Sequence, residues 1–143
     1  EQTAAELLRV VKPGGRIGLA NWTKEGFIGA LFDLMKEHVP PPPGLLSPME
    51  WGAETRLVEL FGPEVRDIRT ARRHYSFRYR SAEHWIEVFR TYYGPTFKAF
   101  AALDEAGRAR LHAALLALLA RWNEDGDRSL LVRGEYLEVV LVK

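Results

Sequence analysis

Cysteine is absent from this chain of 143 residues, and neither sign of charge is in excess. Without cysteine the chain has no disulfide framework and no thiolate site, which fits a reducing compartment, and we expect a cytoplasmic protein. The 20 basic and 19 acidic residues give a formal net charge of +1. The overall charge therefore does not favour nucleic acid or an acidic membrane as a partner.

Long apolar runs and known catalytic motifs are missing as well. No stretch approaches the roughly 18 to 20 apolar residues of a membrane-spanning helix, so we expect no membrane association. The four histidines have no spacing typical of a zinc site, and the chain has no P-loop or nucleophile elbow. His84 and Glu87 lie three apart on one predicted helical face and suit a solvated surface pair better than a base with its orienting carboxylate. The sequence thus predicts no metal site and leaves the catalytic residues unknown.

The chain is organised around residues 7–22. A helical face of apolar residues ends near Lys12, where Pro13-Gly14-Gly15 predicts a helix stop and a tight turn. The segment Ile17–Ala20 that follows is apolar without alternation, which predicts a parallel strand covered on both faces. The residues of the helical face are Ala4, Leu7, Leu8 and Val11.

The run ELLRVVKPGGRIGLANW resembles the helix and fifth strand of class I S-adenosylmethionine-dependent methyltransferases. The resemblance continues through NWTKEGFIGALF, YRSAEHWIEVFRTYYGP and the closing YLEVVLVK, and the chain looks like the small-molecule methyltransferases of the menaquinone and ubiquinone type. It implies an α/β fold in which residues 1–143 form the C-terminal part of one Rossmann-like domain. This part would hold the last three strands, with the final strand antiparallel beside Ile17–Trp22, and residues 81–126 would be a helical insertion covering the substrate site.

The chain departs from this family where the family binds its cofactor. The Gly-rich turn after the first strand and the acidic residue ending the second strand are absent, and Gly14–Gly18 precedes a strand instead of following one. We therefore expect S-adenosylmethionine to be bound mainly by sequence absent here, with no cofactor-binding residues in this chain and no activity of the chain alone. The chain begins with Glu1 instead of Met, so we also expect a truncated, cleaved or dissected protein, with removal of a Met by processing as the alternative.

Residues expected at the substrate site follow from the strand end and from aromatic side chains. In open α/β sheets ligands bind beyond the carboxyl ends of strands, which places Asn21 and Trp22 where chemistry would occur. Phe27, Trp51 and Tyr93 are the expected walls of the cavity for a small organic substrate. Thr23 is expected to cap a helix over residues 23–38.

A basic strand follows between Ala71 and Tyr79, where aromatic residues alternate with arginine and histidine. Such a row can track a nucleic-acid backbone, or it can protect an edge strand from pairing with another chain. The balanced charge of the whole chain favours edge protection, so nucleic acid is not the expected partner.

Further signals place the remaining elements. Ser47-Pro48-Met49-Glu50 is a capping-box pattern for a short turn, and Ser81 and Asp104 are expected N-caps of two helices. The last segment, Tyr136–Val142, is β-branched and apolar, which predicts a central strand.

Two functional classes follow from these observations. The first is the substrate-side half of an S-adenosylmethionine-dependent methyltransferase for a small organic molecule. The alternative is a non-catalytic dimerisation or binding module derived from that fold. Because one edge of the Ile17–Trp22 strand is left without a neighbour, we expect self-association or pairing with the missing N-terminal half.

Overall fold

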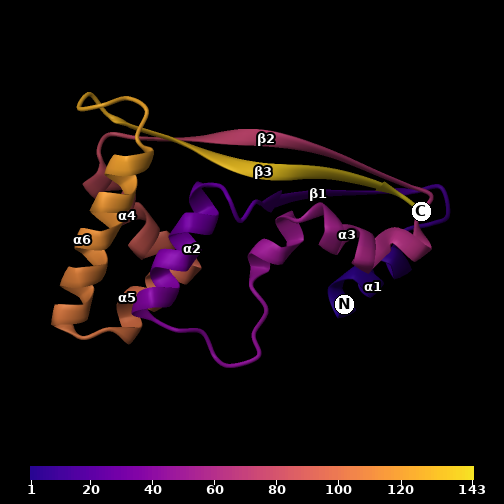
Figure 1. Ribbon diagram of the computed structural model, residues 1–143, viewed down its shortest axis with the longest axis horizontal. Coiled ribbons are helices and arrows are strands. Elements are labelled where there is room, and N and C mark those ends of the chain that lie inside the picture. Colours follow the sequence, from indigo (N-terminus) through magenta and orange to yellow (C-terminus); the bar gives the residue numbers. More distant parts are fainter. The chain divides into compact units, whose positions relative to one another are not determined.

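The computed structural model describes all residues, 1–143, and has an α/β architecture (Figure 1). It forms two compact units, each made of several stretches of the chain. Unit 1 comprises Glu1–Gly26, Leu46–His74 and Glu135–Lys143, and unit 2 comprises Phe27–Leu45 and Tyr75–Gly134. The elements in chain order are α1 (Gln2–Val10), β1 (Arg16–Trp22), α2 (Phe27–His38), the 3-10 helix η1 (Pro48–Gly52), α3 (Glu54–Phe61), the 3-10 helix η2 (Gly62–Glu64), β2 (Asp67–Tyr79), α4 (Ala82–Tyr92), α5 (Gly94–Ala102), α6 (Glu105–Trp122) and β3 (Leu130–Val142).

The predicted helix, tight turn and strand are confirmed as α1, the turn at residues 13–15 and β1. Gly14 has a φ of 80°, a conformation that residues with a Cβ rarely adopt. Lys143 closes this turn, since its carbonyl accepts from the N–H of Gly14 at 2.7 Å. The Nζ of Lys143 also donates to the carbonyls of Leu8 and Val11 at 2.6 and 3.0 Å. The last residue thus satisfies carbonyls that the end of α1 would otherwise leave without partners.

The three strands form one sheet in the order β1-β3-β2. β1 and β3 pair antiparallel, with Ile17 opposite Leu141 and Trp22 opposite Tyr136, so the predicted antiparallel and central final strand is confirmed. The expectation of a parallel strand covered on both faces was wrong for this chain. β3 is the neighbour of β1, and Gly18 and Ala20 are exposed on the face that points away from the helices.

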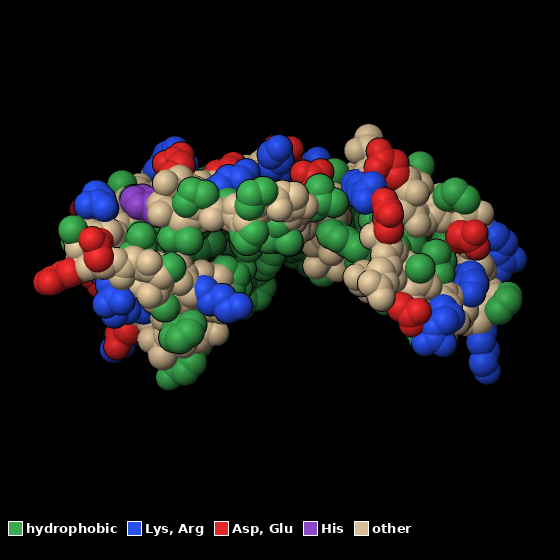
Figure 2. All heavy atoms as spheres, turned by 90° about the horizontal axis from the view of Figure 1, so that it is seen from below, with side chains coloured by type: hydrophobic (Ala, Val, Ile, Leu, Met, Phe, Trp, Pro, Cys, Tyr) green, Lys and Arg blue, Asp and Glu red, His purple; other side chains and the backbone are tan.

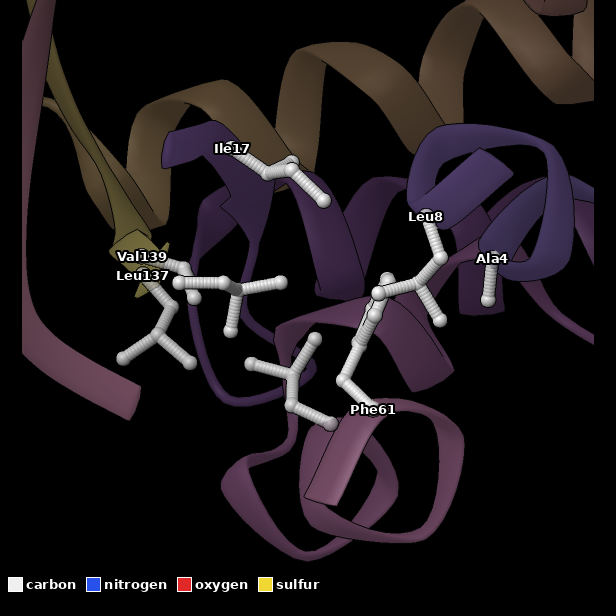
Figure 3. Packing of buried hydrophobic residues seen from close by; sticks show 8 residues of the cluster. Ala4, Leu8, Ile17, Phe61, Leu137 and Val139 are labelled. Atoms are coloured by element: carbon white, nitrogen blue, oxygen red, sulfur yellow. The ribbon is translucent and has the colours of Figure 1, made fainter. Parts of the chain in front are cut away.

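The core of unit 1 lies between the other face of the sheet and two helices. Figure 3 shows Ile17, Leu137 and Val139 of the strands facing Leu8 and Phe61 of α1 and α3. These side chains are almost completely removed from water, and their burial is the main free-energy source for this unit. The full set of buried residues is Ala4, Leu8, Ile17, Leu57, Phe61, Leu137, Val139 and Leu141.

Unit 2 is built from four helices and parts of β2 and β3. Phe27 is fully buried at its centre, with ring centroids of Phe77, Trp85 and Trp122 at 5.9, 5.8 and 5.9 Å. Trp85 also stacks on Phe89 at 3.7 Å. Edge-to-face and stacked pairs add to the burial free energy of large rings, so this aromatic cluster is the structural centre of the unit.

The predicted caps are only partly confirmed. The side chains of Ser81 and Asp104 accept from the N–H groups of His84 and Gly107, and Ser47 accepts from Met49 at the start of η1. The expectation that Thr23 caps a helix was wrong. α2 begins at Phe27, and the Thr23 hydroxyl is instead engaged with β3.

The arginines of β2 are balanced by nearby carboxylates. Arg69 pairs with Asp67 at 2.6 Å, and Arg73 pairs with Glu138 at 3.5 Å. Figure 2 shows basic and acidic side chains interspersed over the face that it draws. β2 is an edge strand of the sheet, so these charges suit protection against pairing with another chain.

None of the helices combines the length and the apolar character needed to cross a membrane.

Candidate functional site

A cluster of polar side chains lies in unit 1 where β1 ends. We call Thr23, Arg72, His74 and Glu135 the Glu135 cluster. Thr23 is fully buried, and its backbone N–H continues the β1–β3 pairing by donating to the carbonyl of Glu135 at 3.2 Å. Its hydroxyl donates to Oε1 of Glu135 at 2.9 Å. The two strands therefore bring a hydroxyl and a carboxylate together over a separation of 112 residues.

The two oxygens of Glu135 have different surroundings. Oε1 accepts from Nη1 of Arg72 at 2.6 Å as well as from Thr23, whereas Oε2 lies 3.9 Å from Nε2 of His74. Arg72 also lies 3.9 Å from the carboxylate of Glu25. Two donors on Oε1 fix the orientation of the carboxylate, so Oε2 is directed toward the half-exposed imidazole.

The charges of this cluster govern the ionisation of Glu135. Partial burial alone would raise the pKa of its carboxyl. The hydrogen bonds from Thr23 and Arg72, together with the positive charge of Arg72 and the nearby His74, outweigh burial and lower the pKa below its usual value. Glu135 is therefore an ionised, oriented carboxylate at neutral pH.

Replacing the charge of Glu135 is expected to have a pH-dependent effect on stability. A lowered pKa in the folded state stabilises the fold above the pKa of the unfolded chain, and this contribution is lost as the pH falls through the folded pKa. We expect Glu135→Gln to lower the free energy of unfolding by about 1 kcal/mol at pH 7, because the amide keeps the shape but loses the charge-assisted bonds. Urea unfolding between pH 3 and 7 measures this difference.

Glu138→Gln in the same strand is the matched control for this experiment. Glu138 pairs with Arg73 at 3.5 Å, and its side chain is 46% exposed. We therefore expect Glu138→Gln to change the free energy of unfolding little at any pH between 3 and 7. Only below the folded-state pKa of Glu135, which is lower than the usual value for a glutamate, are the protonated wild type and Glu135→Gln expected to have equal stability. A difference that persists unchanged at low pH would mean that the charge of Glu135 is not what stabilises the cluster.

A cavity of about 360 Å³ adjoins Arg72 in the same unit. The residues that line it include the basic Lys24 and Arg72, the acidic Glu25, Glu50 and Glu54, and Met49 and Gly52 of η1. The charges of both signs surround a space that suits a small polar molecule better than an apolar one.

The close approach of η1 to the end of β1 depends on Gly52. A Cβ at this position would overlap the carbonyl oxygen of Trp22 and lie 3.0 Å from the Cα of Thr23. Gly26 likewise leaves room for the cluster, since a Cβ there would lie 3.0 Å from the Thr23 hydroxyl. Two glycines thus let the backbone pack directly against the strand end.

Three of the residues predicted for the substrate site lie in unit 1. Asn21 is partly buried on the helix-covered face, and its Nδ2 is a buried donor without a hydrogen-bond partner. Trp22 points to the opposite face and meets the ring of Tyr136 edge-on at 6.1 Å. Trp51 packs against Phe61 at the margin of the unit 1 core. These three side chains surround the strand end from different sides and do not form one wall.

The other two predicted residues lie in unit 2. Phe27 is at the centre of the aromatic cluster and has no exposed surface. Tyr93 contacts Phe89 at 4.9 Å, and burial raises the pKa of its hydroxyl. Phe27 therefore serves packing, whereas Tyr93 keeps part of its surface exposed.

The sequence patterns did not single out Glu135, and they placed Arg72 and His74 only on the polar face of a strand. One signal was present in the sequence. In an alternating strand Glu135 shares a face with Leu137, Val139 and Leu141, which are all buried. A carboxylate at this position therefore needs a partner. The identity of the partners depends on strand pairing across 63 and 112 residues, which the spacing of the residues does not reveal.

The Gly14-Gly15 turn does not fit a cofactor. The N–H groups of both glycines are already bonded, Gly14 to the carbonyl of Lys143 and Gly15 to that of Lys12. No free amides remain there to bind a ligand, which agrees with the position of the turn before a strand. His, Asp and Glu side chains also form no group of three that could hold a metal ion.

No protein-family model matches the chain. The chain is similar to proteins described as uncharacterized from Mycobacterium tuberculosis and Mycobacterium bovis, which are 34% identical over 130 residues. This match covers 88% of the chain and 47% of each relative. A second Mycobacterium tuberculosis protein, also described as uncharacterized, is 33% identical over 141 residues, with 96% of the chain and 50% of the relative covered. The chain thus spans about half the length of the curated relatives it matches.

Proposed function

We propose that this chain is the substrate-side half of an S-adenosylmethionine-dependent methyltransferase that acts on a small organic molecule. The observation that carries the proposal is the arrangement of α1, the Pro13-Gly14-Gly15 turn and β1, with the last strand antiparallel beside β1. The sequence of this segment resembles the corresponding part of class I methyltransferases, whose final strand takes the same place. In this proposal α4, α5 and α6, which span residues 82–122, are the helical insertion that covers the substrate.

The strand end supplies groups suited to a polar substrate. The Nδ2 donor of Asn21 is buried without a partner, and a buried donor costs free energy unless something accepts from it. Glu135 is ionised and oriented next to His74, and a cavity adjoins Arg72. In this proposal these groups bind and orient the acceptor molecule, because methyl transfer depends mainly on the alignment of the reacting atoms. S-adenosylmethionine would supply the methyl group and would be held mainly by chain outside residues 1–143.

Calorimetric titration of S-adenosylmethionine and its demethylated product tests this proposal. The titrations use the 143-residue chain and the same chain extended upstream to the start of its gene. Binding to the extended protein alone supports the half-domain proposal. Tight binding to the short chain would overturn the assignment of the cofactor contacts. If neither protein binds, the methyltransferase proposal fails, and a monodisperse, cooperatively unfolding chain would then favour the non-catalytic binding module.

A further inference from the structure

The cavity beside Arg72 is lined by ionised side chains of both signs, and only some of them have partners within the chain. Arg72 donates to Oε1 of Glu135 at 2.6 Å and lies 3.9 Å from the carboxylate of Glu25. The side chains of Lys24, Glu50 and Glu54 make no ion pair and no hydrogen bond. Positive and negative groups that the fold itself does not use therefore face one space.

The basic side of this cavity is oriented by the Glu135 cluster. Thr23 and Arg72 both donate to Oε1 of Glu135, so the carboxylate fixes the guanidinium that lines the cavity. The N–H groups of Arg72 other than those on Nη1 make no hydrogen bond within the chain. Together with the ammonium of Lys24, they suit a carboxylate or another small anionic group.

The acidic side comes from one short stretch of chain. Glu50 belongs to η1, and Glu54 is the first residue of α3, with only Ala53 between the two helices. Gly52 holds this stretch close to the end of β1, since a Cβ at that position would overlap the carbonyl oxygen of Trp22. The two carboxylates are thus carried by backbone that packs against the sheet, and they suit an ammonium or another small cationic group.

We infer that this cavity binds a small zwitterion, with its anionic group against Arg72 and Lys24 and its cationic group against Glu50 and Glu54. A ligand with one kind of charge would leave the opposite set of side chains without a partner and would bring like charges together. The volume of about 360 Å³ is small for a ligand cavity and suits a molecule of the size of an amino acid. The role of this zwitterion as the methyl acceptor rests on the proposed function, whereas its binding does not.

Backbone amide chemical shifts of the 143-residue chain test this inference. The probes are glycine, 4-aminobutyrate and 6-aminohexanoate, which differ in the distance between their charges. They are titrated at low and constant ionic strength, because salt screens exposed charges. We expect at least one probe to shift the amides of Gly52, Ala53 and Thr55 in a saturable way. The carboxylic acid and the amine of the same length are expected to bind at least about 10-fold more weakly, since each lacks one set of charge-assisted contacts.

Lys24→Met and Glu54→Gln separate the two ends of the site. We expect each to weaken binding of the best zwitterion by about 10-fold. Lys24→Met is expected not to weaken binding of the amine, and Glu54→Gln is expected not to weaken binding of the carboxylic acid. Lys12→Met and Glu59→Gln are the matched controls, because both residues are exposed in unit 1 and neither lines the cavity.

Three results would overturn the inference. The first is the absence of saturable shifts with every zwitterion. The second is equal affinity for a zwitterion and for its acid or amine analogue, since the cavity would then recognise a single charge. S-adenosylmethionine also carries an amino and a carboxylate group, so it is titrated as a further probe. If it shifts the same amides with higher affinity than the simple zwitterions, the ligand is the cofactor and the acceptor assignment fails.

The zwitterion titration and the cofactor titration can fail independently. A chain that binds a zwitterion in this cavity, while the extended protein binds no S-adenosylmethionine, supports the zwitterion site and refutes the methyltransferase proposal. An extended protein that binds the cofactor, while the cavity takes no zwitterion, supports the methyltransferase proposal and refutes the zwitterion site.

Discussion

Gly52→Ala is expected to destabilise unit 1 by about 3 kcal/mol, the largest effect that we anticipate for a single methyl group in this protein. The added Cβ would overlap the carbonyl oxygen of Trp22 and come within 2.9 Å of its carbonyl carbon. These are backbone atoms of β1, so they cannot move aside as the end of a flexible side chain can. Relief requires η1 or the end of β1 to shift, which would also displace Thr23 from Glu135.

Urea unfolding of the variant measures this loss, with Gly18→Ala as the control. Gly18 lies in the same unit and in a strand, but its Cβ would meet no atom within 4 Å. We expect Gly18→Ala to be neutral or to stabilise the 143-residue chain by up to about 1 kcal/mol, since alanine reduces the entropy of the unfolded chain. Equal stability of the two variants would show that η1 is not held against the strand end as the structure places it.

Asn123→Ala is expected to lower the free energy of unfolding by about 2 to 3 kcal/mol, because one side chain holds the connection between α6 and β3. Its Nδ2 donates to the carbonyls of Gly126 and Ser129 at 2.7 and 2.9 Å. Its Oδ1 accepts from the N–H groups of Asp125 and Leu131 at 3.1 and 2.9 Å. Alanine would leave three partly buried backbone groups, those of Ser129, Asp125 and Leu131, without this partner, and it would release the exposed carbonyl of Gly126, which has a φ of 61°.

Asp127→Ala in the same loop provides the comparison for Asn123. Asp127 is exposed, and its replacement is expected to change the free energy of unfolding by less than about 0.5 kcal/mol. The rate of proteolysis between residues 123 and 130 offers a second measurement, since a loosened loop is cut sooner. If Asn123→Ala behaves like Asp127→Ala in both measurements, the four hydrogen bonds do not hold this loop.

Local patterns in the sequence predicted those elements whose causes are local. The PGG stop after α1, the caps at Ser81 and Asp104 and the apolar β-branched final strand each depend on residues a few positions apart. Thr23 is the instructive failure. A hydroxyl before an apolar helix normally indicates a cap, but the partner of Thr23 is Glu135, 112 residues further along the chain. Local preference was overridden by a buried hydrogen bond made across two strands.

The candidate site shows the same division. Asn21 and Trp22 were predicted at the end of β1 because a strand delivers the residues that follow its apolar run to one end of a sheet. Phe27 was expected in a cavity wall for its aromatic side chain, yet it lies fully buried among Phe77, Trp85 and Trp122. An aromatic residue in the sequence does not by itself distinguish a ligand contact from a core position, because burial of its large apolar area is favourable in both places.

The sequence by itself determined the α/β class, the helix, turn and strand at residues 2–22 and the antiparallel last strand, since periodicity, turn residues and family resemblance are properties of short segments. Only the tertiary structure decided that Glu135 meets Thr23, Arg72 and His74, and that Gly18 and Ala20 of β1 are exposed on the face away from the helices. These features depend on the register of β3 against its neighbouring strands and on which face of the sheet the helices cover. Both depend on contacts between residues far apart in the chain, which no local pattern records.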